Sequence, residues 1–77
     1  NIDVYKIVEN ALSNKEGVKD VKSIKIISIG TEKYLGIVKV DYIDSFTDLE
    51  IINLNKIIED NIKTIDSRFL HLYLIPA

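Results

Sequence analysis

The only histidine of the chain, His71, lies in the closing run RFLHLYLIPA and is the first candidate for metal chemistry. Imidazole is a common zinc ligand, but zinc takes about four N, S or O ligands in tetrahedral geometry. The chain has no cysteine, which excludes thiolate ligands, disulfides and thiol chemistry. A histidine without a neighbouring histidine or cysteine favours a hydrogen-bonded residue on a partly covered strand face. The alternative is that His71 is one ligand of a peripheral or intersubunit zinc site.

A second group of potential ligands is acidic and lies between residues 41 and 50. Asp41, Asp44, Asp48 and Glu50 could hold a hard cation through their oxygen atoms. Their spacing matches no calcium loop, however, and the central glycine of such loops is absent. Thr47 and Glu50 have the spacing of a capping box, and acidic residues are favoured at a helix N-terminus. We therefore interpret these acids as the start of a helix.

No residue pattern supports catalysis, so we expect no enzyme and no catalytic residues. A nucleophile needs an adjacent base with an orienting partner, and the serines share a single imidazole. Gly30 and Gly36 are isolated, so no glycine-rich phosphate loop is present. The net charge of −2 and the pI near 5.2 argue against nucleic acid as a partner, because its recognition needs a basic stripe.

The length of 77 residues predicts one small domain, residues 1–77, with 47% hydrophobic residues to build its core. A domain of this size buries only about 60% of its unfolded surface. No apolar stretch approaches the roughly 20 residues of a spanning helix, so we expect no direct membrane insertion by this chain. The sequence contains no methionine, and we therefore expect a piece excised from a longer parent.

Hydrophobic periodicity predicts helices and strands in the order α-β-β-α-β. The predicted helices are residues 2–16 and 48–63, and the predicted strands are residues 21–29, 34–43 and 68–75. Gly17 suits the position just past the first helix, and residues 30–33 supply a hairpin turn. The apolar seam of the second helix comprises Ile51, Leu54, Ile58 and Ile62. We expect the first strand to be substantially buried on both faces and Pro76 to end the pairing of the last strand.

Alternation along the second strand divides its side chains between two faces. One face carries Gly36, Val38, Val40 and Tyr42, and the other carries Leu35, Ile37, Lys39 and Asp41. Two helices on one face of a three-stranded sheet make a two-layer α+β sandwich. The other face has no helix to cover it, and an exposed apolar sheet face marks a partner surface. In the last strand, alternation places His71 on one face with Phe69, Tyr73 and Ile75.

Short motifs in this order cover nearly the whole chain. They are GVKDV (residues 17–21), IKIISIG (24–30), VKV (38–40), DSFT (44–47), IE (58–59) and the closing proline. Together they resemble the cytoplasmic C-terminal domain of cation diffusion facilitator transporters, which are metal-ion/proton antiporters. The corresponding family patterns include G-V-x-x-V at the entry to the first strand and a closing I-H-x-E-P.

The resemblance implies a ferredoxin-like or metallochaperone-like fold that pairs as a homodimer. It also implies a parent chain with a transmembrane domain, which places this domain at the cytoplasmic side of the cell membrane. Metal-binding members carry a histidine three residues before the closing proline and a carboxylate just before it. Here those positions are Tyr73 and Ile75, and the other ligand positions would fall near Lys22, Lys39 and Ile52. We therefore expect no tail zinc cluster and no cofactor, and weak zinc binding at His71 is the alternative.

These observations predict the homodimerisation and regulatory domain of a divalent-cation efflux transporter, acting as a constitutive dimer clamp. The predicted dimer interface comprises Leu35, Ile37, Phe69, His71, Tyr73 and Ile75. The alternative is a small-molecule-binding, ferredoxin-like regulatory module of an enzyme. Such modules usually open with a strand before the first helix, and NIDVYK is a poor strand.

Overall fold

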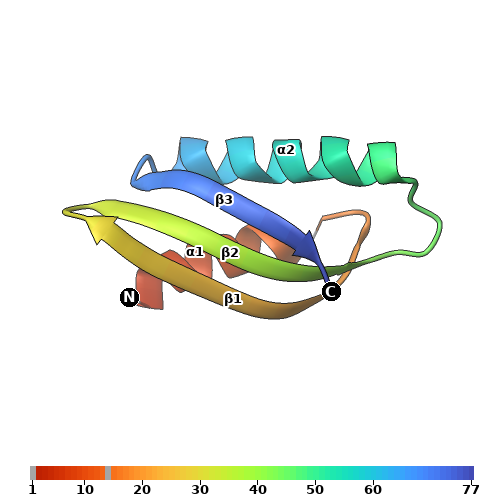
Figure 1. The fold of residues 1–77 in the computed structure, drawn as a ribbon, viewed down its shortest axis with the longest axis horizontal. Coiled ribbons are helices and arrows are strands. Elements are labelled where there is room, and N and C mark those ends of the chain that lie inside the picture. Colours follow the sequence, from red (N-terminus) through yellow and green to blue (C-terminus); the bar gives the residue numbers. More distant parts are fainter. Residues whose placement is uncertain (1, 14) are drawn as a thin grey trace.

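A computed structural model describes residues 2–13 and 15–77 of the chain. The elements follow in the order α1 (Ile2–Ser13), β1 (Val18–Gly30), β2 (Lys33–Tyr42), α2 (Asp48–Ile65) and β3 (Phe69–Pro76). In Figure 1, α1 lies behind β1 and β2, and α2 runs beside β3. The predicted α-β-β-α-β order is confirmed. No helix among the described residues is long and apolar enough to cross a membrane.

The strands form one sheet in the order β1-β2-β3, with β2 in the centre. β1 and β2 are antiparallel and joined by a tight hairpin, in which Glu32 has a φ of 56°. β2 and β3 are parallel. A parallel pair needs a crossover connection, and α2 supplies it.

The buried side chains of both helices and of the sheet form one core. Both helices therefore pack on the same face of the sheet. β2 contributes the predicted face, on which Gly36, Val38, Val40 and Tyr42 are all buried. A Cβ atom at Gly36 would lie 2.5 Å from Cδ1 of Leu72, so the missing side chain leaves room for this core residue of β3. The helices and β3 contribute Val4, Val8, Leu12, Leu54, Ile58, Ile62, Phe69 and Leu72.

The predicted capping box at the start of α2 is confirmed. The Glu50 backbone N–H donates to Oγ1 of Thr47 at 3.2 Å, and the Thr47 backbone N–H donates to Oε1 of Glu50 at 3.1 Å. Both bonds satisfy backbone donors that the first helical turn leaves without partners. α2 continues to Ile65, two residues beyond the predicted end, and the N–H of Asp66 then closes it on the Ile62 carbonyl at 2.9 Å.

The first helix is shorter than predicted. α1 ends at Ser13, residues 15 and 16 lie outside the helix, and Asn14 lies outside the described residues. Gly17 belongs instead to the turn before β1, where its φ is 97°. A Cβ atom there would lie 2.3 Å from the Phe46 ring, so this aromatic side chain packs directly on the turn. The turn before β1 is therefore held by a tertiary contact as well as by the positive φ of Gly17.

Two predictions about the strands are wrong. β1 is longer than expected, and Ile27 and Ile29 on its second face are exposed because no helix covers that side. Pro76 does not end the pairing of β3: it lies opposite Val40, and the Ala77 N–H donates to the Val40 carbonyl at 2.8 Å. Since successive residues of a strand point their N–H groups in opposite directions, the missing N–H of proline falls on the outer edge.

Candidate interaction surface on the open sheet face

The face of the sheet opposite the helices is called here the open face. The pairing register arranges its side chains in three rows across β1, β2 and β3. The rows are Ile27–Leu35–His71, Lys25–Ile37–Tyr73 and Ser23–Lys39–Ile75. Adjacent residues of each strand point into the core, so these side chains point away from it.

Apolar side chains occupy most positions of the open face. Tyr73 is 50% exposed, Ile75 and Ile27 are also exposed, and Leu35 and Ile37 are half-buried by their neighbours alone. The two lysines, Lys25 and Lys39, are exposed. Long basic side chains can cover apolar surface with their stems while the ammonium group stays in water. The open face is thus a continuous apolar strip with cations beside it.

The predicted place of Phe69 on this face is wrong. Tyr34 pairs with Phe69 but Leu35 pairs with His71, so Leu70 is an extra residue in β3. Such a bulge shifts the alternation by one residue. Phe69 is therefore in the core, only 2% exposed, with its ring centroid 6.1 Å from that of Tyr34. The other five residues of the predicted interface lie together on the open face.

His71 lies on the open face and its ring is stacked beside that of Tyr73, with the centroids 6.0 Å apart and the planes 18° apart. Its neighbour on β2 is Leu35. Among residues 2–13 and 15–77, no group of three or more His, Cys, Asp or Glu side chains could hold a metal ion. Within the described residues, His71 is therefore not part of a group of three such side chains.

The two edge strands of the sheet carry features that hinder pairing with a strand of another chain. On the outer edge of β3, the Leu72 N–H donates to Oε2 of Glu59 at 3.3 Å, and Lys63 pairs with the same oxygen at 3.5 Å. Pro76 removes another donor from this edge. On the other side of the sheet, β1 carries three register irregularities. Side-chain caps, prolines and bulges are the devices that keep sheet edges from pairing with other chains.

Sequence reasoning missed a polar cluster that fixes the start of β3. The Arg68 Nε donates to Oδ1 of Asp66 at 2.9 Å, and the Arg68 backbone N–H donates to the same oxygen at 3.0 Å. These hydrogen bonds hold the pKa of the Asp66 carboxyl below its usual value. Arg68 also pairs with Glu32 at 3.5 Å and lies 5.4 Å from the Tyr34 ring centroid. The D-x-R spacing of residues 66–68 could have indicated the Asp66–Arg68 pair. The contact of Arg68 with Glu32 then joins the α2–β3 turn to the β1–β2 hairpin.

By sequence, neither a protein-family model nor a curated protein matches the chain. Solved structures do match its fold. An aspartate-to-asparagine variant of the MamM CTD in its nickel form has a TM-score of 0.87 at 12% identity, covering 100% of this chain and 96% of that one. The zinc form of that variant gives 0.85 at 12% identity, with coverage of 99% and 82%. A glutamate-to-histidine variant in its nickel form gives 0.87 at 12% identity, with coverage of 100% and 96%.

The matched structures are C-terminal domains of the cation diffusion facilitator family, which have a ferredoxin-like fold. The likeness extends over nearly the full length of both chains, so it concerns the whole arrangement of helices and strands. This confirms the fold that the sequence resemblance implied: a two-layer α+β sandwich with a three-stranded sheet, of the same type as the MamM CTD.

Proposed function

We propose that this chain is the cytoplasmic homodimerisation domain of a divalent-cation efflux transporter, and that the open face of one copy binds the open face of a second. The fold of the MamM CTD supports the assignment to such a transporter. The observation that carries the proposed dimer is the apolar sheet face, which neither α1 nor α2 covers in the described part of the chain. The transmembrane domain of the same parent chain would then be the second partner, at the cytoplasmic side of the cell membrane.

The size of the chain is compatible with an interface of standard area on the open face. A standard protein–protein interface takes about 800 Å² from each partner, roughly a sixth of the 4994 Å² surface of this chain. The described part of the chain measures 40 × 19 × 18 Å, and the sheet runs along its longest dimension (Figure 1). One whole face of a two-layer domain can supply the required area.

The charges on the open face constrain how two copies meet. A two-fold dimer brings the same patch together from both subunits. Lys25 and Lys39 would repel their counterparts if they met at the centre, so we place Leu35, Ile37 and Tyr73 at the centre. Their apolar contact would exclude water, while the lysine ammonium groups extend to the solvated rim.

Dimerisation in this proposal does not depend on a metal ion. The positions near which the family's zinc ligands would fall are occupied by side chains that bind zinc poorly at neutral pH: Tyr73, Ile75, Lys22, Lys39 and Ile52. Lys22 is already paired with Asp20, at 3.0 Å. Burial of apolar surface is therefore the driving force that we assign to association. Zinc shared by two His71 side chains across the two-fold axis is the competing explanation.

Sedimentation velocity of the purified chain tests the proposal, in EDTA and then with added zinc. We expect a dimer in EDTA at micromolar to millimolar concentrations, with no change on adding zinc. A monomer in EDTA that dimerises only with zinc would establish a metal-dependent contact and contradict the clamp. A monomer under both conditions would reject dimerisation through the open face altogether.

A further inference from the structure

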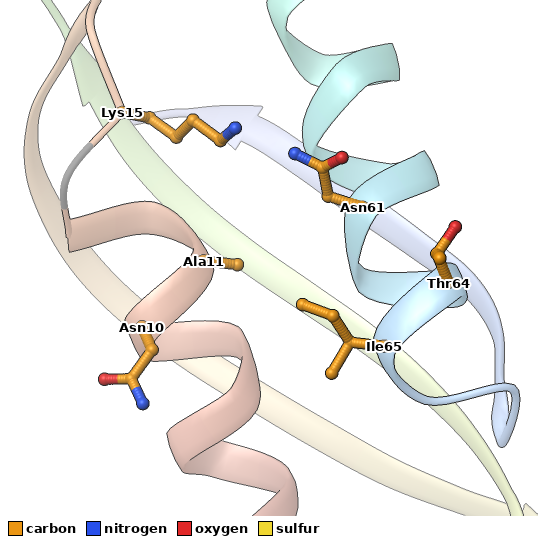
Figure 2. Close-up of a pocket in the computed structure, with 6 residues that line it drawn as sticks. All are labelled: Asn10, Ala11, Lys15, Asn61, Thr64 and Ile65. Atoms are coloured by element: carbon orange, nitrogen blue, oxygen red, sulfur yellow. The ribbon is translucent and has the colours of Figure 1, made fainter.

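A hollow of about 400 Å³ lies between α1 and α2, in the helix layer and away from the open face. Its walls come from the second half of α1, from the turn that follows, and from the last turns of α2 (Figure 2). The lining residues are Asn10, Ala11, Lys15, Asn61, Thr64 and Ile65. Small-molecule sites usually have volumes of about 300–1,000 Å³, with apolar walls and a few polar groups. The hollow falls within that range.

The apolar part of the hollow is formed by one side chain from each helix. Ala11 of α1 and Ile65 of α2 extend into the gap between the helices (Figure 2). Ile65 is 63% exposed, which leaves most of a large apolar side chain in water. Covering such surface is favourable, because it removes apolar surface from water. A ligand with a short branched apolar body would cover it.

The polar part of the hollow includes two donors, Lys15 and Asn61, that no acceptor of the described residues pairs with. Lys15 is half-buried, and no carboxylate pairs with its ammonium group among the described residues. Asn61 is half-buried, and its side-chain amide makes no hydrogen bond within the described part of the chain. In Figure 2 the Lys15 ammonium and the Asn61 amide nitrogen extend toward one another across the mouth of the hollow. The Thr64 hydroxyl is already committed, because it donates to the Asp60 carbonyl at 2.8 Å.

We propose that this hollow binds a small monocarboxylate with a branched apolar body. A carboxylate has two acceptor oxygens, one for the Lys15 ammonium and one for the Asn61 amide. Among the described residues, the wall holds one cation, Lys15, and no acidic residue. It can therefore neutralise one negative charge of a ligand but not two. The net charge of −2 further disfavours multiply charged anions such as phosphate. This proposal concerns the helix layer and does not rest on dimerisation.

The test is a titration of the whole chain with 3-methylbutanoate, followed by NMR. Two comparison probes are used: 3-methylbutanamide, which has the same shape without the charge, and inorganic phosphate. We expect saturable shifts of the Ala11 and Ile65 methyl signals and a Kd for the carboxylate at least tenfold lower than for either comparison probe. Equal affinity for the carboxylate and the amide would overturn the proposal, and so would tighter binding of phosphate or the absence of shifts at both methyl groups.

Matched variants locate the site. Lys15→Gln removes the charge and should weaken carboxylate binding at least tenfold, and Asn61→Ala should weaken it severalfold. Lys19→Gln removes the same charge from an exposed lysine on β1, outside the hollow, and should leave the affinity unchanged. Equal weakening by Lys15→Gln and Lys19→Gln would mean that only the overall charge matters, and it would reject the site. Far-UV circular dichroism establishes that each variant is folded.

Discussion

Replacing Tyr73 with alanine should abolish the proposed dimer without unfolding the monomer. Tyr73 is 50% exposed, and a fully covered tyrosine side chain buries roughly 150–250 Å², so about 100 Å² is available to a partner. At about 25 cal/mol per Å², this area is worth roughly 2 kcal/mol per copy after allowing for the Cβ atom that alanine keeps. Two-fold symmetry counts the loss twice, which gives about 4 kcal/mol and about a thousandfold increase in the dimer Kd.

Tyr5 provides the matched control, because it is 40% exposed on α1, away from the open face. Tyr5→Ala removes the same atoms and should change the dimer Kd by less than about 0.5 kcal/mol, as expected of a surface substitution away from an interface. Sedimentation velocity across a dilution series measures both dissociation constants. The reasoning is refuted if Tyr73→Ala dimerises as tightly as Tyr5→Ala, because the apolar centre of the open face would then contribute nothing.

Three further predictions concern the fold and the metal. Because Arg68 lowers the folded-state pKa of Asp66, the Asp66 carboxylate stabilises the fold above its unfolded pKa of about 3.9, and this stabilisation is lost as the pH falls through the lowered value. Asp66→Asn should therefore lower the urea midpoint more at pH 7 than at acidic pH, where the carboxylate of the parent chain is being protonated. Gly17→Ala should cost about 1–3 kcal/mol in urea denaturation, because its Cβ would lie 2.3 Å from the Phe46 ring. Zinc should leave the thermal midpoint unchanged; a stoichiometric rise of several degrees that His71→Ala abolishes would show instead that His71 binds zinc.

The features that local sequence determines were predictable. The capping box depends on two side chains three residues apart, and its hydrogen bonds are those expected from Thr47 and Glu50. The two faces of β2 follow from strict alternation in a strand without irregularities along its core residues, so Val38 and Val40 were placed correctly. The open face was predicted because the two helices were both expected on one face of the sheet, which leaves the other face without a helix.

The features that depend on distant contacts were not predictable. The core place of Phe69 depends on the bulge at Leu70, and nothing in the local pattern of FLHLYL distinguishes a bulge from regular alternation. The packing of the Phe46 ring on Gly17 brings two distant parts of the chain together, which the local pattern around Gly17 does not indicate. The Arg68 cluster joins Asp66 to Glu32 across the fold, a contact that requires β3 to lie parallel to β2.

The structure of the β3 edge and of the open face favours association through the open face over strand pairing at the edge. Pairing through the edge of β3 would have to displace Glu59 from the Leu72 N–H and find no donor at Pro76, so it would lose hydrogen bonds as it gained them. Pairing through the open face displaces no intramolecular hydrogen bond that the structure shows and covers apolar side chains that already face water. Removing the cap separates the two modes. Glu59→Ala leaves the Leu72 N–H without its acceptor, and it should leave the dimer Kd unchanged if the subunits meet face to face.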